Sequence, residues 1–311
     1  MLDGVSDIHL CEANPGESMV FPGPFRINGD LLAKTETLLS RCKACAKVDF
    51  MITLDGLFFR GRKEMRAVDG VWYHLRKMPS VPPTLETLPS RLPPALSKML
   101  LSPRLREGGL IYVIGPPGSG KTTTASAAVV SRIGLYGGFA YTVEDPPEMP
   151  LNGWHEKGYC RQTWVAGDTS ADWAESFRGV LRSQPAGTPT ILYVGEVRDS
   201  ESAQAMLRAA SNGFLVIATG FGTDIVSGVD ALAQLTGKQD NTLTMLASVL
   251  RLVIHQRLHN GQMVATSLAS VDTKGQVAAK IRSGSFTHLV SDVQFQANQA
   301  MLGFNVFDAR D

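Results

Sequence analysis

The residues with the clearest chemical pattern occupy positions 115–122. They fit G-x-x-x-x-G-K-[ST] without a mismatch: Gly115, Pro116, Pro117, Gly118, Ser119, Gly120, Lys121 and Thr122. Glycines let such a loop wrap its N–H groups around phosphate oxygens, and the positive end of the following helix adds to their effect. We expect Lys121 to reach the β- and γ-phosphates, the Thr122 hydroxyl to ligate Mg²⁺ and Thr123 to line the same site. The pattern predicts a P-loop that binds ATP and Mg²⁺.

The flanks of this loop agree with the pattern. The apolar run Leu110–Ile114 comes before it and is predicted to be a strand, and the small-residue run Thr123–Ser131 follows and is predicted to be a helix. The alternative interpretation is a glycine-rich turn with a chance lysine. A match at every motif position and on both flanks favours the P-loop.

A second chemical candidate is Glu196, which follows the apolar run Ile191–Val194. A carboxylate at the carboxyl end of a strand lies beside the phosphate loop in nucleotide-binding sheets, where it binds Mg²⁺ through water or orients the attacking water. We predict that Glu196 is the general base and a residue of the metal site. The alternative is a solvated glutamate at the end of a strand.

These residues need a sheet to position them, and the sequence from Gly109 onward predicts one. Four short apolar runs with few polar interruptions are typical of strands covered on both faces by helices. They are Leu110–Ile114, Phe139–Val143, Thr190–Val194 and Phe214–Thr219. After Ser227 the pattern favours helices, and Leu243–Ile254 is the clearest helical stretch. This part of the chain is therefore predicted to be an α/β domain with a parallel sheet.

The first eighty residues predict a smaller α+β domain. The chain contains one amphipathic helical stretch there, Leu31–Lys47, and the turn dipeptides Asn28-Gly29 and Asp55-Gly56. The second dipeptide separates two apolar runs, as a hairpin turn does. The expected strands are Ser6–Leu10, Ser18–Ile27, Phe50–Leu54, Leu57–Arg62 and Val71–Lys77.

A proline-rich segment separates these two regions. Six prolines stand between Pro79 and Pro94, and because proline lacks the N–H donor, such a stretch forms a connector or helix starts rather than a sheet core. We therefore predict an amino-terminal domain at 1–80, a linker with a connecting helix at 81–106, and an ATPase domain at 107–311.

Composition narrows the class of protein. The chain has 311 residues, 44% apolar and 19% charged, with a formal net charge of +1, so it is typical of a globular protein. No dense Lys/Arg run is present, which argues against direct nucleic-acid binding. We expect no secretory signal peptide and no transmembrane segment. The predicted location is the cytoplasm, with membrane association through partners.

The cysteines offer one further motif, the C-x-x-C of Cys42 and Cys45. This spacing suits a redox pair or half of a zinc site. The sequence provides no second pair to complete a zinc set and no thioredoxin-like context, which favours two plain thiols on a helix.

Taken together, the motifs resemble those of the type II and type IV secretion and pilus motor ATPases of the GspE/PilT type. Residues 195–199 resemble the family's Walker B signature G-E-[IM]-R-D, and residues 144–148 its acidic box E-D-P-x-E. Residues 176–182 are similar to its A-L-R-x-x-L-R helix, 253–258 to V-I-x-Q-R-L, and 6–10 to S-D-[IL]-H-[IL]. The resemblance covers nearly the whole chain and is strongest to the compact retraction-type and conjugation-type members.

This resemblance implies a RecA-like P-loop ATPase domain preceded by a small PAS-like α+β domain. It also implies a homo-oligomer, a hexameric ring, that works with an inner-membrane platform protein on a pilus or on exported cargo. Glu144 and Glu148 would support Mg²⁺ and position water. Three arginines, Arg60, Arg62 and Arg76, would reach the γ-phosphate, a task that suits the planar guanidinium fork.

The sequence departs from the family in its histidine box, G-H-L-V-x-x-T-L-H-T. Phe214 and Phe221 stand at the two histidine positions, and phenylalanine cannot hydrogen-bond to a phosphate. We therefore predict retained ATP binding and slow or partner-dependent hydrolysis. His155, after the acidic box, stays a candidate substitute.

Three functions remain open on the sequence alone. The first is a motor ATPase of a pilus, conjugation or secretion machine. The second is a nucleotide-binding accessory ring subunit with weak or no hydrolysis. The third is a RecA-like helicase or recombinase, which predicts a basic, aromatic-lined loop for single strands that this chain lacks.

Overall fold

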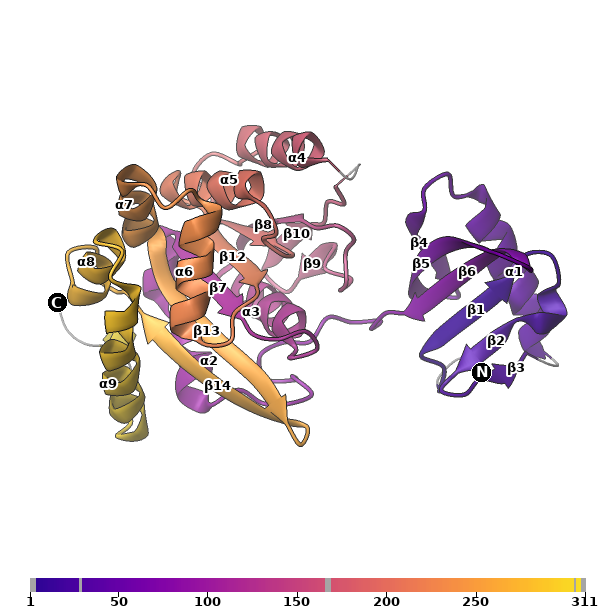
Figure 1. The fold of residues 1–311 in the computed structure, drawn as a ribbon, viewed down its shortest axis with the longest axis horizontal. Coiled ribbons are helices and arrows are strands. Elements are labelled where there is room, and N and C mark those ends of the chain that lie inside the picture. Colours follow the sequence, from indigo (N-terminus) through magenta and orange to yellow (C-terminus); the bar gives the residue numbers. More distant parts are fainter. Residues whose placement is uncertain (1–3, 28–29, 166–168, 305, 309–311) are drawn as a thin grey trace. The chain divides into compact units, whose positions relative to one another are not determined.

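The structure is a computed structural model that describes residues 4–27, 30–165, 169–304 and 306–308. The chain divides into two compact units, residues 1–81 with 146–150, and residues 82–145 with 151–311. Figure 1 labels the elements of both, and each unit is described by itself. The Asn28-Gly29 turn predicted from the sequence lies outside the described residues.

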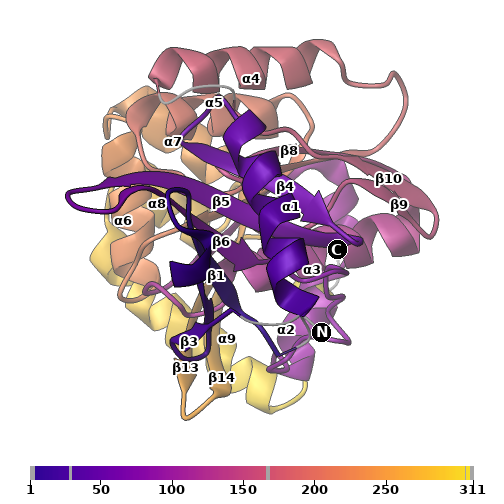
Figure 2. The ribbon, with the colours of Figure 1, turned by 90° about the vertical axis from the view of Figure 1, so that its right-hand side faces the viewer.

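The amino-terminal unit is a six-stranded antiparallel sheet with one long helix. The strand order is β3-β2-β1-β6-β5-β4. Helix α1 lies against the sheet (Figure 2), and its buried side chains include Leu38, Leu39 and Cys42. The elements are β1 (Asp7–Cys11), β2 (Met19–Phe21), β3 (Phe25–Arg26), α1 (Asp30–Ala44), β4 (Asp49–Leu54), β5 (Leu57–Arg66) and β6 (Gly70–Lys77).

The hairpin predicted at Asp55-Gly56 is confirmed. Leu54 pairs with Leu57 across the turn, and both turn residues have positive φ, 50° at Asp55 and 76° at Gly56. A two-residue loop of this kind matches the right-handed twist of its strands, and Gly56 adopts the conformation at no steric cost.

The two cysteines of the C-x-x-C motif have different surroundings, because Cys42 lies on the core side of α1 and Cys45 follows the end of the helix and is half-exposed. Cys42 is fully buried, and burial, followed by the neighbouring Cys45, raises the pKa of the Cys42 thiol to about 12. A raised pKa disfavours the thiolate that redox and metal chemistry require. Within the described residues, no group of three or more His, Cys, Asp or Glu side chains could hold a metal ion.

The larger unit is an eight-stranded sheet with helices on both faces. Its strand order is β14-β13-β7-β12-β11-β8-β10-β9, and the six strands from β13 to β10 are parallel to one another. The outer strands β14 and β9 run antiparallel to their neighbours. The four predicted strands are therefore confirmed as the central β7, β8, β11 and β12.

The bounds of the strands in this unit are β7 (Gly109–Ile114), β8 (Gly138–Val143), β9 (Gly153–His155), β10 (Gly158–Arg161), β11 (Thr190–Val194), β12 (Leu215–Gly220), β13 (Leu250–His259) and β14 (Gln262–Ala269). Those of the helices are α2 (Pro94–Leu100), α3 (Lys121–Tyr136), α4 (Ser170–Arg182), α5 (Ser200–Ser211), α6 (Ile225–Leu235), α7 (Asp240–Val249), α8 (Gln276–Arg282) and α9 (Leu289–Met301). In the described part of the chain, none of the helices has the length and apolar character needed to span a membrane.

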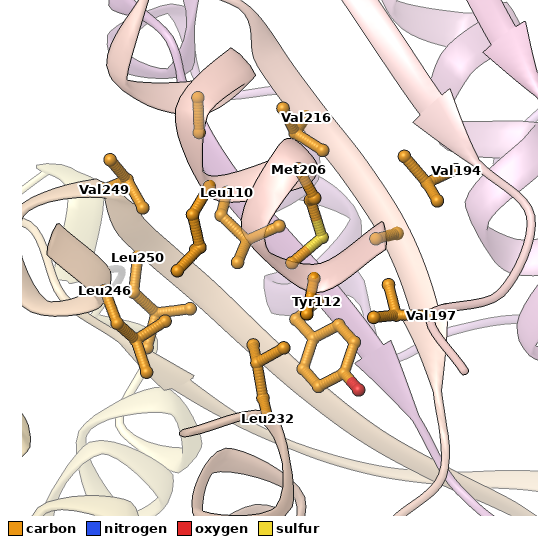
Figure 3. Close-up of a cluster of buried hydrophobic side chains, with 14 of the residues drawn as sticks. Leu110, Tyr112, Val194, Val197, Met206, Val216, Leu232, Leu246, Val249 and Leu250 are labelled. Carbon is orange, nitrogen blue, oxygen red and sulfur yellow. The ribbon is translucent and has the colours of Figure 1, made fainter. Parts of the chain in front are cut away.

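The hydrophobic core of this unit lies between one face of the sheet and helices α4 to α8. Leu110, Tyr112 and Ile114 of β7 belong to it, with residues of β11, β12 and those helices. Figure 3 shows part of this cluster, including Met206 of α5 and Leu232 of α6. The alternate residues Ile111 and Val113 are also buried, because α3 covers the opposite face of β7. Helices thus cover both faces of the sheet.

The helix predicted over Leu243–Ile254 is wrong in its second half. Helix α7 ends at Val249, and Leu250 begins strand β13, which pairs in parallel with β7. Leu250, Leu252, Val253 and Ile254 are buried in the sheet. A short apolar run suits a buried helix and a buried strand equally well by periodicity, and the pairing with β7 decides for the strand.

The two phenylalanines of the atypical histidine box have different surroundings. Phe214 is completely buried in the core cluster, and its backbone oxygen accepts a hydrogen bond from the N–H of Gly109 (3.0 Å). Phe221 is 58% exposed. Phe214 therefore contributes packing beneath the strand end, whereas Phe221 is free to contact other groups.

We predict that Phe214→His lowers the free energy of unfolding by about 2–4 kcal/mol, because an imidazole in this site removes apolar contacts and buries polar nitrogens. Phe221→His, the matched control at the exposed position, should change it by less than about 0.5 kcal/mol. Urea titration followed by circular dichroism measures both. Equal destabilisation by the two substitutions would contradict the assignment of Phe214 to the core.

Candidate nucleotide-binding site

The P-loop connects the buried strand β7 to helix α3. Every residue of β7 is buried, and α3 begins at Lys121. Gly115, Gly118 and Gly120 have positive φ values of 154°, 73° and 81°, a region that side-chain-bearing residues rarely adopt. The sequence therefore puts glycine at each point where the loop changes direction.

Hydrogen bonds within the loop hold it compact. The Lys121 ammonium donates to the carbonyl oxygen of Pro116 (3.0 Å), and the N–H of Ser119 donates to the same oxygen (3.3 Å). Pro116, Pro117 and Gly118 are exposed, whereas Lys121, Thr122 and Thr123 are partly exposed. The first N–H groups of α3 have no partner within the helix. The rim of the loop thus offers a cation and helix N–H groups to an anion.

A buried glutamine supports the loop from the neighbouring strand. Gln256 of β13 is completely buried, and its Nε2 donates to the carbonyl oxygen of Ser119 (2.7 Å). Gly115 lies so close to β13 that an added Cβ would overlap the carbonyl oxygen of Gln256. Strand β13 therefore contacts the loop at its first and fifth positions.

The surroundings of the Ser119 hydroxyl indicate whether this loop fits a phosphate group. Ser119 is only 3% exposed, and its Oγ has no hydrogen-bond partner. A buried polar atom without a partner costs free energy. Residues 116–118 beside it are exposed. The unpartnered Ser119 hydroxyl therefore fits a site in which a bound phosphate group supplies the missing hydrogen bond.

Glu196 follows β11 and is held on both sides by the end of β12. The N–H of Val197 donates to the carbonyl oxygen of Thr219 (2.9 Å), and the Thr219 hydroxyl donates to the carbonyl oxygen of Gly195. The Glu196 carboxylate accepts a hydrogen bond from Nε of Arg198 (2.6 Å). These hydrogen bonds therefore fix the backbone on both sides of Glu196. Its partly exposed carboxylate lies beside the Arg198 guanidinium.

Glu144 follows β8, the strand beside β11. It is 1% exposed, and its Oε1 accepts a hydrogen bond from Nε2 of Gln162 (2.9 Å). A Cβ at Gly195 would lie 3.2 Å from its Cγ, so Glu144 is packed against the residue that precedes Glu196. A larger residue at 195 would therefore have to push the Glu144 side chain aside by a few tenths of an ångström.

The remaining predicted residues belong to the amino-terminal unit. Arg60, Arg62 and Arg76 line one cavity of about 260 Å³ on its sheet. Arg62 pairs with Asp49 and Arg76 with Asp7, each at 2.8 Å. Burial raises the pKa of Asp7, but hydrogen bonds from Arg76 and Ser6 outweigh it and lower that pKa overall.

Glu148 lies in the segment 146–150, which groups with the amino-terminal unit, and its carboxylate is 3.6 Å from Arg60. His155, the candidate substitute for the missing histidines, hydrogen-bonds through Nε2 to the carbonyl oxygen of Leu151 (2.7 Å). The Nε2 atom of His155 is therefore already occupied by a hydrogen bond within its own segment.

The structure brings one predicted set together in the larger unit. Lys121 and Thr122 follow β7, Glu144 follows β8 and Glu196 follows β11, and carboxyl ends of parallel strands meet at one edge of a sheet. The contributions of Gln256, Thr219 and Gln162 were not predicted. The sequence does contain a signal for Gln256, because it is the one amide at the end of the mainly apolar run 252–256. A polar side chain that is buried in such a run needs a hydrogen-bond partner.

A P-loop on a mainly parallel, helix-covered sheet with acidic residues at the same edge defines a nucleotide-binding α/β protein. Residues 68–288 match the family model described as type II/IV secretion system protein. The chain belongs to this family, as its resemblance to GspE/PilT-like proteins predicts. The uncharacterised protein YggR of Escherichia coli K12 is 31% identical over 272 residues, which cover 82% of this chain and 77% of YggR.

Other relatives match over a shorter part of their length. The type II secretion system protein HxcR of Pseudomonas aeruginosa is 35% identical over 175 residues, 56% of this chain and 33% of HxcR. The chain spans about a third of the first curated relatives that it matches. The crystal structure of the pilus retraction motor PilT with bound ADP superposes with a TM-score of 0.72 and 26% identity, covering 94% of this chain and 86% of PilT.

We predict that Gln256→Leu weakens Mg·ATP binding about three- to tenfold, up to about 1.4 kcal/mol, because the Ser119 carbonyl loses its donor and the loop its anchor. Global stability should change by about 1 kcal/mol or less, since leucine fills a similar volume and also removes the unpartnered Gln256 Oε1. Calorimetric titration measures the dissociation constant. Gln234→Leu, on the exposed face of α6, is the control, and an unchanged constant in Gln256→Leu would contradict the anchoring role.

Proposed function

We propose that this chain is an ATP-hydrolysing motor subunit of a pilus or secretion machine. The observation that carries the proposal is the P-loop at 115–122, with Lys121 and Glu196 at the same edge of one sheet. The names of the relatives support the cellular process, because they include secretion proteins and a pilus retraction motor that binds ADP. Pilus assembly, pilus retraction and type IV secretion or conjugation all belong to this class.

In the proposed reaction, Lys121 and the N–H groups at the start of α3 bind the β- and γ-phosphates. Thr122 and Glu196 would hold Mg²⁺, which when bound neutralises phosphate charge. Glu196 accepts the proton of the attacking water, and Glu144 and Glu148 support the position of that water. A general base of this kind contributes roughly 10²–10⁴ to the rate. The hydrogen bond from Arg198 keeps the Glu196 carboxylate in place before the reaction.

The assembly is part of the same proposal. The chain would form a homo-oligomer, a hexamer, from a PAS-like domain at 1–80, a linker at 81–106 and a RecA-like domain at 107–311. Arg60, Arg62 and Arg76 would bind the γ-phosphate, for which their permanent charge is suited. The ring would act in the cytoplasm on an inner-membrane platform protein, without direct contact to nucleic acid.

A second candidate function is a nucleotide-binding accessory ring subunit with little hydrolysis. The observation that favours it is the loss of both histidines, because Phe214 is committed to the core and Phe221 offers no hydrogen bond. Steady-state phosphate release separates the two candidates, since only the motor turns over ATP.

We predict that Lys121→Ala abolishes both ATP binding and hydrolysis, because it removes the cation that faces the phosphates. Glu196→Gln should keep ATP binding within about twofold while the hydrolysis rate falls roughly 10²–10⁴-fold, since an amide accepts no proton from water. Binding is measured by calorimetry and hydrolysis by phosphate release.

Glu201→Gln, an exposed carboxylate on α5, serves as the matched control for the charge change. The Glu201→Gln protein should hydrolyse ATP at the same rate as the wild type. A Glu196→Gln protein that hydrolyses ATP as fast as the wild type would remove Glu196 from the role of base. A wild type that binds ATP without hydrolysing it would select the accessory subunit.

A further inference from the structure

His255 lies on β13 next to the glutamine that supports the P-loop. Its backbone pairs with Ile114, the last residue of β7 before the loop. Since side chains alternate along a strand, Gln256 faces Ser119 and His255 faces the other side of the sheet. The Nε2 atom of His255 is buried and has no hydrogen-bond partner. The residue as a whole is half-buried, and a buried ring nitrogen without a partner calls for a physical role.

The imidazole borders a cavity of about 410 Å³ beside the P-loop. Pro116 of the P-loop and Phe221, Gly222 and Thr223 line it with His255 and Thr266. The Gly222 backbone lies close enough to the His255 ring to oppose the lowering of its pKa. His255 of β13 therefore lies beside loop 221–223, and the cavity that both line also reaches Pro116.

Loop 221–223 continues directly from the end of β12 that holds Glu196. Thr219 accepts from the N–H of Val197 and donates to the carbonyl oxygen of Gly195. Two residues after Thr219 the chain reaches Phe221 and the cavity. Loop 221–223 is thus only a few residues from the backbone that brackets Glu196.

We propose that His255 is a positioning residue for ATP hydrolysis, which fixes loop 221–223 and through it the backbone at Glu196, while Gln256 fixes the P-loop from the other face of β13. This role rests on the proposed function of the chain as an ATPase. It differs from the roles of the P-loop and the arginines, because His255 lies on β13 and borders the cavity with Phe221, Gly222 and Thr223.

The charge state of His255 matters for this role. Burial lowers the pKa of His255, Arg257 on the same strand lowers it further, and Asp224 at the start of α6 and the Gly222 backbone oppose them. The net direction is downward from the ordinary value of about 6.5. At neutral pH the ring is uncharged, and a proton added at acidic pH would create a buried N–H at Nε2 with no acceptor. Acidification below about pH 6.5 should therefore disturb the loop and slow hydrolysis.

The test compares three variants of the full chain. His255→Leu removes the imidazole beside Gly222, and His255→Asn keeps a polar side chain there that cannot titrate. His259→Leu alters an exposed histidine on the same strand. The dissociation constant for Mg·ATP, the hydrolysis rate kcat between pH 5 and 8, and circular dichroism are measured for each.

We expect His255→Leu to bind Mg·ATP within about twofold of the wild type but to lose about tenfold in kcat, a size typical of a misplaced catalytic group. His255→Asn should restore most of kcat and abolish the acid-side decline that the wild type shows. His259→Leu should match the wild type throughout.

Two results would overturn the role of His255 while leaving the proposed function intact. One is wild-type kcat in His255→Leu, and the other is an unchanged acid-side decline in His255→Asn. If the wild type binds Mg·ATP without hydrolysing it, the proposed hydrolysis fails and the role of His255 fails with it.

Discussion

The close approach of β13 to Gly115 is the contact on which the geometry of the site depends. A side chain at position 115 would overlap the Gln256 carbonyl, so the P-loop leaves β7 with its backbone directly against the next strand. The same glutamine then donates to Ser119 from beneath the loop. Two contacts from one residue therefore hold both halves of the loop, and they require β13 to pair with β7 in its observed register.

Strand β12 plays the corresponding part on the other side of β7. Its end binds the backbone of Gly195 and Val197, which brackets Glu196. The edge that carries the candidate site is thus a set of backbone turns, each held by the strand beside it. In this arrangement Phe214 belongs to the core just before β12, and His255 of β13 lines the cavity beside the loop that follows β12.

Much of this site could be predicted because its signals are local. The P-loop is contiguous, Glu196 directly follows its strand, and the four central strands are short apolar runs with clear boundaries. The Asp55-Gly56 hairpin is specified by two residues. Strand β13 was predicted as helix because an apolar run at 250–254 suits either structure, and the partner that decides lies about 140 residues earlier in the chain. The contact between Gln256 and Ser119 is equally distant in sequence. Neither could be derived from periodicity, and the same holds for the different surroundings of Phe214 and Phe221.

Nucleotide binding should require Gly115, and calorimetric titration with Mg·ATPγS tests this most directly. Gly115→Ala should weaken binding at least about tenfold, or 1.4 kcal/mol, while circular dichroism shows that the fold persists. Gly179→Ala, on an exposed turn of α4 with open space around it, should bind one nucleotide per chain as the wild type does. A folded Gly115→Ala protein with wild-type affinity would contradict the claim that the contact with β13 shapes the P-loop.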